Sequence, residues 1–159
     1  MNEKYQRYIE YIVNDIEAPY FINMVDQYGL RPDEYPLILD KVFNQPVTIE
    51  GNYVYNTNGK LIYHEDSNGY CYKNEYDNQG NNIYFEDSNG DWNKSEYDQY
   101  GNNIYFENSY GYWYKKEYDS NGKVIYYEDS RGYWDKYEYD RYGNVIYHEE
   151  NDGVIIDNR

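Results

Sequence analysis

Apolar and polar residues recur from residue 55 to the C-terminus in a unit of 21 residues that is written five times. Each repeat opens with a tyrosine and carries Ile-Tyr at its eighth and ninth places. The opening tyrosines are Tyr55, Tyr76, Tyr97, Tyr118 and Tyr139. Glycines at places five and fifteen divide each repeat into two short segments, and they are Gly59, Gly69, Gly80, Gly90, Gly101, Gly111, Gly122, Gly132, Gly143 and Gly153. Such self-similarity is typical of repeat architectures, in which each unit buries apolar surface by stacking on its neighbours.

Each repeat is predicted to form a β-hairpin, because two turn signals separate its segments. The first turn has the pattern Asp-x-x-Gly, as in residues 77–80, and the second has Asp-Ser-Asn-Gly or a near relative, as in residues 87–90. Asp, Asn and Ser hydrogen-bond their own backbone early in a turn, and glycine accepts the positive φ that closes a type I turn with a bulge. The segments between turns are rich in aromatic and β-branched residues, which favour strands. The five repeats therefore predict about ten strands.

The two faces of these strands follow from the first turn, if that turn is a three-residue loop with glycine last. One face then carries Ile104, Phe106, Trp113, Lys115 and Glu117, and the other carries Tyr105, Glu107 and Tyr118. Each face mixes rings with charges, so the usual alternation of a half-buried sheet is blurred. We expect the Ile/Phe/Trp face to be the core. The alternative is a single open layer with tyrosines on both sides.

Residues 1–54 have a helical period instead. Apolar residues at helical spacing predict helices over 5–16, 21–28 and 32–43, followed by a lead-in strand over 47–55. The third helix has Leu37, Ile38, Leu39, Val42 and Phe43 as its expected buried side. About fifty residues bury too little surface to be stable alone, so this segment is expected to pack on the first hairpins. The predicted fold is thus α+β, with a small helical cap over 1–54 and a hairpin array over 55–159.

The repeats resemble those of a known family. Tyr-Asp-x-x-Gly-Asn recurring every 21 residues, with a second glycine midway, resembles the YD repeats of RHS-type proteins over residues 55–159. In that family the repeats form β-hairpins that spiral into a hollow shell around a toxin or a chain end, so the resemblance implies a hairpin array. A weaker likeness, carried by Gly111-Tyr112-Trp113-Tyr114, is to the aromatic-glycine repeats of bacterial wall-binding modules.

The net charge of the chain limits the classes of partner that it can bind. Thirty acidic and 14 basic residues give a net charge of −16, and 27 tyrosines supply most of the apolar area. A strongly acidic surface repels nucleic acid and anionic membranes and attracts basic proteins. We therefore expect a basic protein partner and neither direct nucleic-acid binding nor membrane association. The N-terminus lacks the layout of a signal peptide, so a cytoplasmic location is expected.

No catalytic constellation stands out from the repeat pattern. His64 and His148 both occupy the tenth place of a repeat, where Phe85, Phe106 and Tyr127 stand otherwise, so they are interpreted as variants of a packing position. Paired acids recur with the repeat and point to opposite faces of a strand, which makes them architectural. The Asp-Ser-Asn-Gly loops lack the ligand spacing of an EF-hand. The sequence predicts a protein that is not an enzyme and has no cofactor and no metal site.

The candidate site is a row of acids flanked by tyrosines. Equivalent residues of successive repeats would lie about 10 Å apart, because neighbouring strands are spaced by roughly 4.8 Å. The predicted partner-binding residues are Glu65, Glu86, Glu107, Glu128, Glu149, Tyr84, Tyr105 and Tyr126. We hypothesise that the row binds a basic, nucleic-acid-handling protein such as a nuclease, imitating nucleic acid as inhibitors of phage or mobile-element type do.

Two other functions are considered. One is a glycan- or cell-wall-binding module that uses its tyrosine and tryptophan rows for stacking. The other is an acidic scaffold whose charge serves only solubility.

Overall fold

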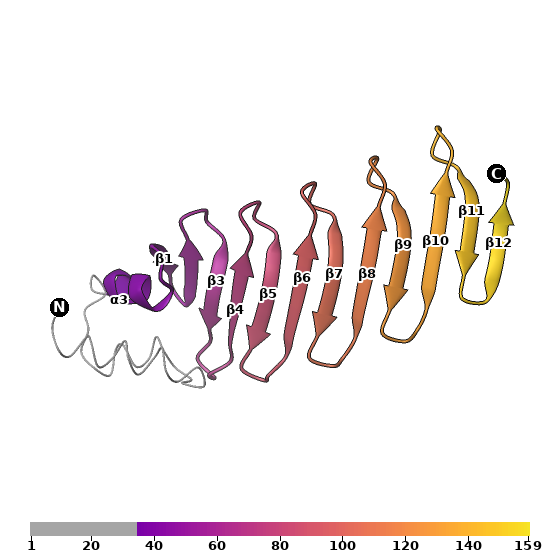
Figure 1. The fold of residues 1–159 in the computed structure, drawn as a ribbon. Helices are drawn as coiled ribbons and strands as arrows, with labels where there is room; N and C mark the ends of the chain where they lie inside the picture. Colours follow the sequence, from indigo (N-terminus) through magenta and orange to yellow (C-terminus); the bar gives the residue numbers. More distant parts are fainter. Residues whose placement is uncertain (1–34) are drawn as a thin grey trace. The chain divides into compact units, whose positions relative to one another are not determined.

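The structure, a computed structural model, describes residues 35–159 as a helix followed by twelve antiparallel strands (Figure 1). These elements are α3 (Tyr35–Val42), β1 (Val47–Glu50), β2 (Tyr53–Asn56), β3 (Leu61–Glu65), β4 (Cys71–Tyr76), β5 (Asn82–Asp87), β6 (Trp92–Tyr97), β7 (Asn103–Asn108), β8 (Trp113–Tyr118), β9 (Val124–Asp129), β10 (Trp134–Tyr139), β11 (Val145–Glu150) and β12 (Gly153–Asp157). The chain forms two compact units. The first has 35–75 and 85–90 as its described part, and the second consists of 76–84 and 91–159.

The predicted fold class is wrong, because the described chain is a mostly-β hairpin array and not an α+β fold. A single helix of eight residues stands against twelve strands in the part of the chain that the structure describes. The helices predicted over 5–16 and 21–28 lie outside the described residues. The third predicted helix corresponds to α3, and the predicted hairpins after residue 55 are present.

The first unit holds the most fully buried apolar side chains among the described residues. Leu39 on α3, Val54 on β2 and Ile62 on β3 are 2%, 0% and 4% exposed. The helix is joined to the next strand by a hydrogen bond from the Val47 backbone nitrogen to Asp40 Oδ1, at 2.8 Å. Asn44 follows the helix at a φ of 51°, a left-handed conformation that asparagine tolerates and that commonly ends helices. The described helix is therefore attached to β1 by both packing and hydrogen bonding.

The lead-in strand predicted over 47–55 is two strands. Val47 on β1 lies opposite Asn56 on β2, and Glu50 lies opposite Tyr53. Gly51 turns the chain between them at a φ of 58°. A two-residue hairpin loop of type II′ needs positive φ at its first central residue, which glycine adopts without strain. The Gly51-Asn52 pair thus makes a tight turn where the sequence analysis expected one extended strand.

The turns of the array have the predicted form. In the first turn of the third repeat, the Asp98 backbone nitrogen donates to the Asn102 carbonyl at 3.0 Å, and the Gly101 nitrogen donates to the Asp98 carbonyl at 3.1 Å. Asp98 Oδ1 accepts from the backbone nitrogens of Tyr100 and Asn102, at 2.8 and 2.9 Å. All ten turn glycines have positive φ, which confirms the turn prediction.

The predicted assignment of side chains to the two faces of the sheet is wrong. Glu96 on β6 pairs with Tyr105 on β7, whereas the next residue, Tyr97, pairs with Asn103. One residue is therefore bulged out between these pairs, and each bulged residue reverses the alternation of side chains on its strand. The assignment made from sequence left out this extra residue. Trp113 lies opposite Glu107, so the tryptophan shares a face with the Tyr/Glu pair and not with Phe106.

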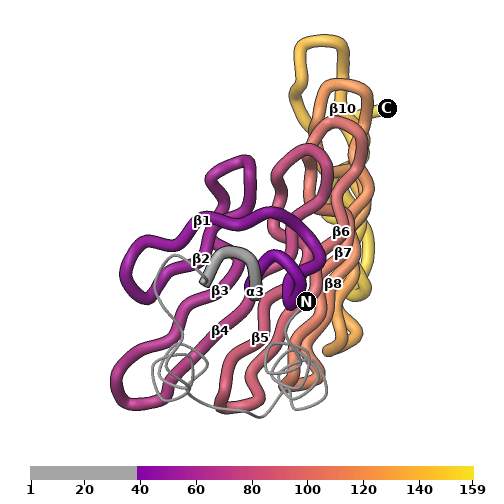
Figure 2. Tube along the Cα trace, turned by 90° about the vertical axis from the view of Figure 1, so that its left-hand side faces the viewer, coloured from indigo at the N-terminus to yellow at the C-terminus, as the bar shows by residue number. Residues whose placement is uncertain are grey.

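The second unit is a single layer, in agreement with the alternative that the sequence left open. Every residue of β7 is half-buried. Three side chains are buried among residues 91–159, and they are Asp129, Asp135 and Tyr147. Figure 2 shows β6, β7 and β8 nearly edge-on, one behind the other. The expected Ile/Phe/Trp core is absent from this unit, and its stability depends on contacts along each face between neighbouring strands.

Among residues 35–159, no helix is long and apolar enough to cross a membrane.

Candidate functional site

One face of the second unit repeats the same group of side chains in each hairpin. In one copy, Glu107 on β7 lies between Lys94 on β6 and Trp113 on β8. Tyr105, two residues before Glu107, lies between Glu96 and Lys115. We call this surface the polar face.

Each tyrosine of this group donates its hydroxyl to the glutamate two residues later. Tyr105 Oη lies 3.0 Å from Glu107 Oε2, because residues i and i+2 of a strand point to the same face. The same bond joins Tyr63 to Glu65, Tyr126 to Glu128 and Tyr147 to Glu149. Burial, and then the hydrogen bond to Glu107, raises the pKa of Tyr105 above its ordinary value. The phenol therefore stays protonated and holds the carboxylate in one orientation.

Lysines on the preceding strand pair with these glutamates. The distance from Nζ to the carboxylate oxygen is 2.7 Å for Lys73–Glu86, 3.7 Å for Lys94–Glu107 and 3.3 Å for Lys115–Glu128. Lys94 and Lys115 also lie over the rings of Trp92 and Trp113, at 5.4 and 5.3 Å from the centroids. The sequence analysis missed these partners, although lysine recurs every 21 residues at 73, 94, 115 and 136. The negative charge of the glutamate row is therefore partly compensated.

The predicted site residues fall into two groups. The second unit brings together Tyr105, Glu107, Tyr126, Glu128 and Glu149 on β7, β9 and β11, and Tyr84 belongs to β5 of the same unit. Glu65 and Glu86 belong to the first unit. Glu65 is only 2% exposed, so its carboxylate lies beneath the surface and is not available to a large partner.

Two open grooves lie on the polar face, one repeat apart. The groove between Tyr105 and Tyr126 has a volume of about 850 Å³ and is lined by four carboxylates and two lysines. Its charged lining residues are Glu96, Asp98, Glu117, Glu128, Lys115 and Lys116. The next groove has a volume of about 640 Å³ and is lined by Glu117, Asp119, Glu138 and Lys136, together with tyrosines. Each groove has two more acids than bases, and Glu117 lines both.

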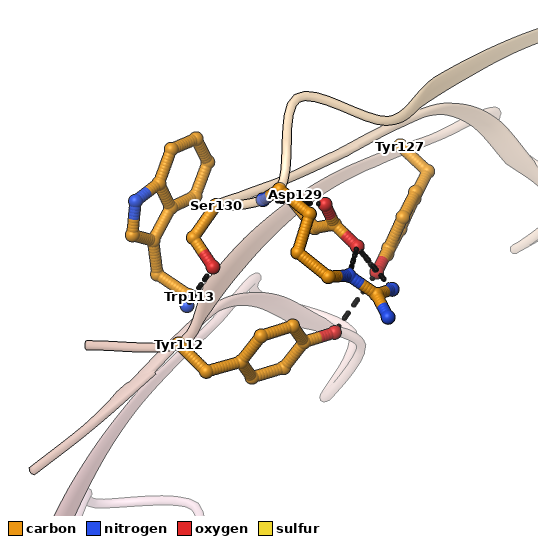
Figure 3. Close-up of polar contacts among 6 residues, drawn as sticks. Tyr112, Trp113, Tyr127, Asp129 and Ser130 are labelled. Atoms are coloured by element: carbon orange, nitrogen blue, oxygen red, sulfur yellow. Dashed lines mark hydrogen bonds and ion pairs between the residues drawn. The ribbon is translucent and has the colours of Figure 1, made fainter. Parts of the chain in front are cut away.

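The opposite surface, which we call the aromatic face, carries the stacked rings. Phe106 and Tyr114 are stacked with their centroids 5.4 Å apart, and Tyr114 is stacked on Tyr127 at 6.0 Å. Figure 3 shows a polar cluster at one end of this face, in which Tyr112 Oη and Tyr127 Oη lie 3.0 Å apart and Tyr127 points at Asp129.

Asp129 in this cluster is a buried carboxylate with a dedicated cation. Its side chain is fully buried, and Arg131 donates to Asp129 Oδ2 from Nε at 3.0 Å and from its terminal nitrogen at 2.5 Å. The hydrogen bonds from Arg131 hold the pKa of Asp129 below its ordinary value. The cluster is a closed ion pair, and we assign it a structural role.

Potential metal ligands gather in a different place. Among residues 35–159, one group brings such atoms together, and its members are Asp135, His148 and Glu150, with their ligating atoms all within 4.8 Å of one another. The sequence analysis interpreted His148 as a packing variant and expected no metal site. These residues lie on two strands, so their meeting depends on the register between β10 and β11.

Comparison with solved structures finds similarity to small parts of much larger chains. No protein-family model and no curated protein matches the sequence. A mutant Tc holotoxin pore of Photorhabdus luminescens with TccC3 is 17% identical, with a TM-score of 0.48, over 65% of this chain and 7% of that chain. The TcdB2–TccC3 structure is 15% identical, with a TM-score of 0.31, over 70% of this chain and 9% of that chain. The chain thus spans less than a tenth of these proteins.

Proposed function

We propose that the protein is a non-enzymatic acidic interaction protein whose polar face binds a basic segment of a partner protein. The two tyrosine-lined acidic grooves carry this proposal. Lysine and arginine side chains suit such grooves, because their ammonium or guanidinium group pairs with carboxylates while their alkyl stem packs on aromatic rings. Equivalent points of the two grooves are two strands apart, which corresponds to roughly 10 Å.

The lysine pairs shift the proposed binding residues away from the glutamate row. Glu107 and Glu128 already face Lys94 and Lys115, so a partner's cation would have to compete with those lysines. Glu96 and Glu117 also line the grooves, and their side chains are exposed. We therefore assign the main attraction to the groove acids Glu96 and Glu117, with the Tyr–Glu pairs as flanking contacts, whereas Glu138 is already paired with Arg159 at 3.2 Å.

The finer form of the proposal is competition with nucleic acid. A regular series of carboxylates on strands resembles a short stretch of phosphate charges, and a protein that handles nucleic acid has a basic groove of matching sign. We propose that the partner is such a protein, for example a nuclease, and that binding inhibits it in the cytoplasm. The same proposal takes the hairpins to be repeats of the YD type, on the strength of their Tyr-Asp-x-x-Gly turns.

The stacking alternative is not adopted. Aromatic platforms for sugars need free ring faces, and Lys94 and Lys115 lie over the rings of Trp92 and Trp113.

The test uses a fluorescent arginine-rich peptide of about ten residues as the basic probe, with anisotropy as the readout. Replacing Glu96 and Glu117 by glutamine should weaken binding about tenfold at 50 mM salt, since each lost exposed charge pair contributes on the order of 0.7 kcal/mol. Affinity of the unmodified protein should fall steeply by 300 mM salt as the charges are screened. In the finer test, the protein should displace a labelled single-stranded DNA from the peptide.

A matched control removes the same charge elsewhere. Glu75 and Asp152 are exposed and line neither groove, so replacing them by glutamine and asparagine should change affinity less than twofold. Equal weakening by both double variants would show that the grooves have no special role. Peptide binding without DNA displacement would overturn only the nucleic-acid part of the proposal.

A further inference from the structure

The hairpin formed by β10 and β11, which we call the last full hairpin, departs from the repeat pattern at three positions. The side chains at these positions lie close together in space. Asp135 stands where the earlier repeats have Tyr72, Asn93 and Tyr114, and His148 stands where they have Tyr127 and Phe106. In the preceding repeat the corresponding pair, Tyr114 and Tyr127, is stacked. An aromatic pair of the repeat has thus been replaced by a carboxylate and an imidazole.

The third departure is Glu150, which stands where the earlier repeats have Asp129 and Asp87. Those aspartates accept hydrogen bonds from their own turn, as Asp129 Oδ1 does from the Arg131 backbone nitrogen. Glu150 is one methylene longer, and its Oε2 accepts from the hydroxyl of Tyr133 at 3.1 Å, a bond that Asp87 also makes with Tyr70. Unlike those aspartates, Glu150 has its carboxylate close to the Asp135 and His148 pair.

The three side chains form a compact set of potential ligands. Asp135 on β10 and Glu150 on β11 are register partners. His148 Nε2 lies 2.8 Å from Asp135 Oδ1, and the ligating atoms of all three residues lie within 4.8 Å of one another. Asp135 is 8% exposed, so one of the carboxylates is buried.

Neighbouring rings hold the imidazole and one carboxylate in place. The ring of Tyr137 is stacked on His148, with centroids 4.3 Å apart and planes 10° from parallel. Tyr133 fixes Glu150 by the hydrogen bond already described. Metal sites are commonly supported by such outer contacts, which orient the ligands before the ion arrives.

Comparison with the preceding repeat indicates that this cluster lacks a cation. There, the buried Asp129 is neutralised by Arg131. In the last hairpin the residue that corresponds to Arg131 is Asp152, and Asp135 has been added. Among the described residues, no lysine or arginine forms an ion pair with Asp135 or Glu150. Two carboxylates have thus gathered around an imidazole where one carboxylate previously had an arginine.

We propose that Asp135, His148 and Glu150 bind a divalent transition-metal ion, with Zn²⁺ as the best fit. Calcium and magnesium prefer ligand sets made of oxygen, whereas an imidazole nitrogen suits zinc and its neighbours. Zinc takes His nitrogen and carboxylate oxygen at about 2.0 to 2.2 Å, and three protein ligands leave a fourth position for water. The ion takes the place of the hydrogen bond between His148 Nε2 and Asp135 Oδ1. The most distant ligand pair closes by rotation about side-chain bonds.

This site has its ligands on the face opposite the acidic grooves and shares with them only Tyr137, which stacks on His148 and borders the smaller groove. Asp135 and His148 alternate along their strands with Lys136 and Glu149, which face each other on the polar face. The metal site therefore lies on the aromatic face, and failure of either proposal leaves the other intact.

The test is a zinc titration of the untagged protein against a chromophoric chelator, with the two imidazole signals followed by NMR. The unmodified protein should bind one zinc ion, and the signals of His148 should shift while those of His64 stay unchanged. The double variant Asp135→Tyr with His148→Phe restores the residues of earlier repeats, so it should fold and bind zinc at least about tenfold more weakly. Glu150→Gln should weaken zinc binding without removing Asp135 or His148.

The chain contains its own matched control. His64 occupies the same place in the first repeat, but its neighbours are the rings of Tyr53 and Tyr72, at 4.4 and 5.2 Å. His64→Phe should therefore leave zinc affinity unchanged. The proposal is overturned if the His148 signals do not move with one equivalent of zinc, or if the folded double variant binds zinc as tightly as the unmodified protein. It is also overturned if His64→Phe weakens binding as much as the double variant does.

Discussion

The glycine that closes each turn holds a backbone conformation that other residues avoid. Gly101 has a φ of 85°, and a Cβ atom added to it would meet nothing within 4 Å. The cost of a larger residue at this position is therefore backbone strain and not a steric clash with neighbours. The two causes can be separated by substitution, because asparagine tolerates positive φ and β-branched residues do not.

Replacing Gly101 by valine should lower the free energy of unfolding by roughly 1 kcal/mol or more, since valine resists positive φ. Gly101→Asn should lower it by clearly less, although both substitutions add a side chain to the same open space. Urea denaturation of the two variants and the unmodified protein provides the measurement. Equal losses for valine and asparagine would contradict the strain explanation.

For single residues, the sequence predicts well which of them form turns, but it predicts poorly on which face of the sheet a side chain lies. The turn at Gly101 follows from residues adjacent in the chain, because Asp98 and the glycine act on their own backbone. The face that Trp92 shares with residues of β7 depends on a bulge several residues away, between Glu96 and Tyr97. No residue type marks that bulge unambiguously, and one uncounted residue transfers a whole strand to the opposite face.

In the first turn of each of the last four repeats, an aspartate carboxylate accepts hydrogen bonds from the backbone of its own turn. The hydrogen bond from Asn102 Nδ2, supported by backbone donors, holds the pKa of Asp98 below its ordinary value. The equivalent aspartates, with pKa values lowered in the same way by side-chain or backbone donors, are Asp77, Asp119 and Asp140. Asn56 accepts the same backbone hydrogen bonds, from Asn58 and Lys60, without a charge.

These turns should make stability depend on pH in a specific direction. The unfolded chain binds protons at these aspartates at higher pH than the folded chain does. Their stabilising contribution is therefore complete above the unfolded pKa, about 3.9, and is lost as the pH falls through the lower folded values. Replacing all four by asparagine should reduce the loss of stability between pH 6 and pH 2.5, measured as the shift in the urea midpoint. An unchanged shift would contradict the assignment.

The cluster of potential metal ligands was not predicted, because it forms only through the pairing of β10 with β11. In the sequence His148 resembles a substitution at a packing position, and that position alone gives no reason to suspect a ligand. A detectable signal exists, however, because Asp135, His148, Glu150 and Asp152 all depart from the preceding repeat within 18 residues. Several changes confined to one hairpin are better explained by a shared function than by drift at separate packing positions.

The whole molecule is governed by the repeat, because each strand of the second unit contacts chiefly its neighbours in the chain. Residues 55–159 carry 21 acids and ten bases, a net charge of −11, and their charge is spread over all repeats. The period and the hairpins could be predicted since they are encoded locally in every copy. The α+β class could not be sustained, because residues 47–55 form a hairpin and the one described helix is short.

A final prediction concerns the removal of one complete repeat, residues 97–117. After this deletion Lys94 takes the place of Lys115 opposite Glu128, and Trp92 takes the place of Trp113, whose carbonyl accepts from the Ser130 nitrogen at 2.9 Å. Each interface is thus replaced by an equivalent one, and stability in such arrays is close to a sum over units and interfaces. The shorter protein should fold, unfold in one cooperative urea transition, and show a smaller denaturant slope in keeping with the surface removed.

The control deletes residues 97–118, which is one residue more. Since side chains alternate with a period of two, this extra residue moves the aromatic face of every later strand onto the polar face. The Tyr–Glu and Lys–Glu contacts on the two sides of the junction then no longer oppose one another. The longer deletion should lose cooperative unfolding and β-sheet circular dichroism, although the two variants differ by a single tyrosine. Similar stability of both deletion variants would mean that the register between neighbouring repeats does not hold the array together.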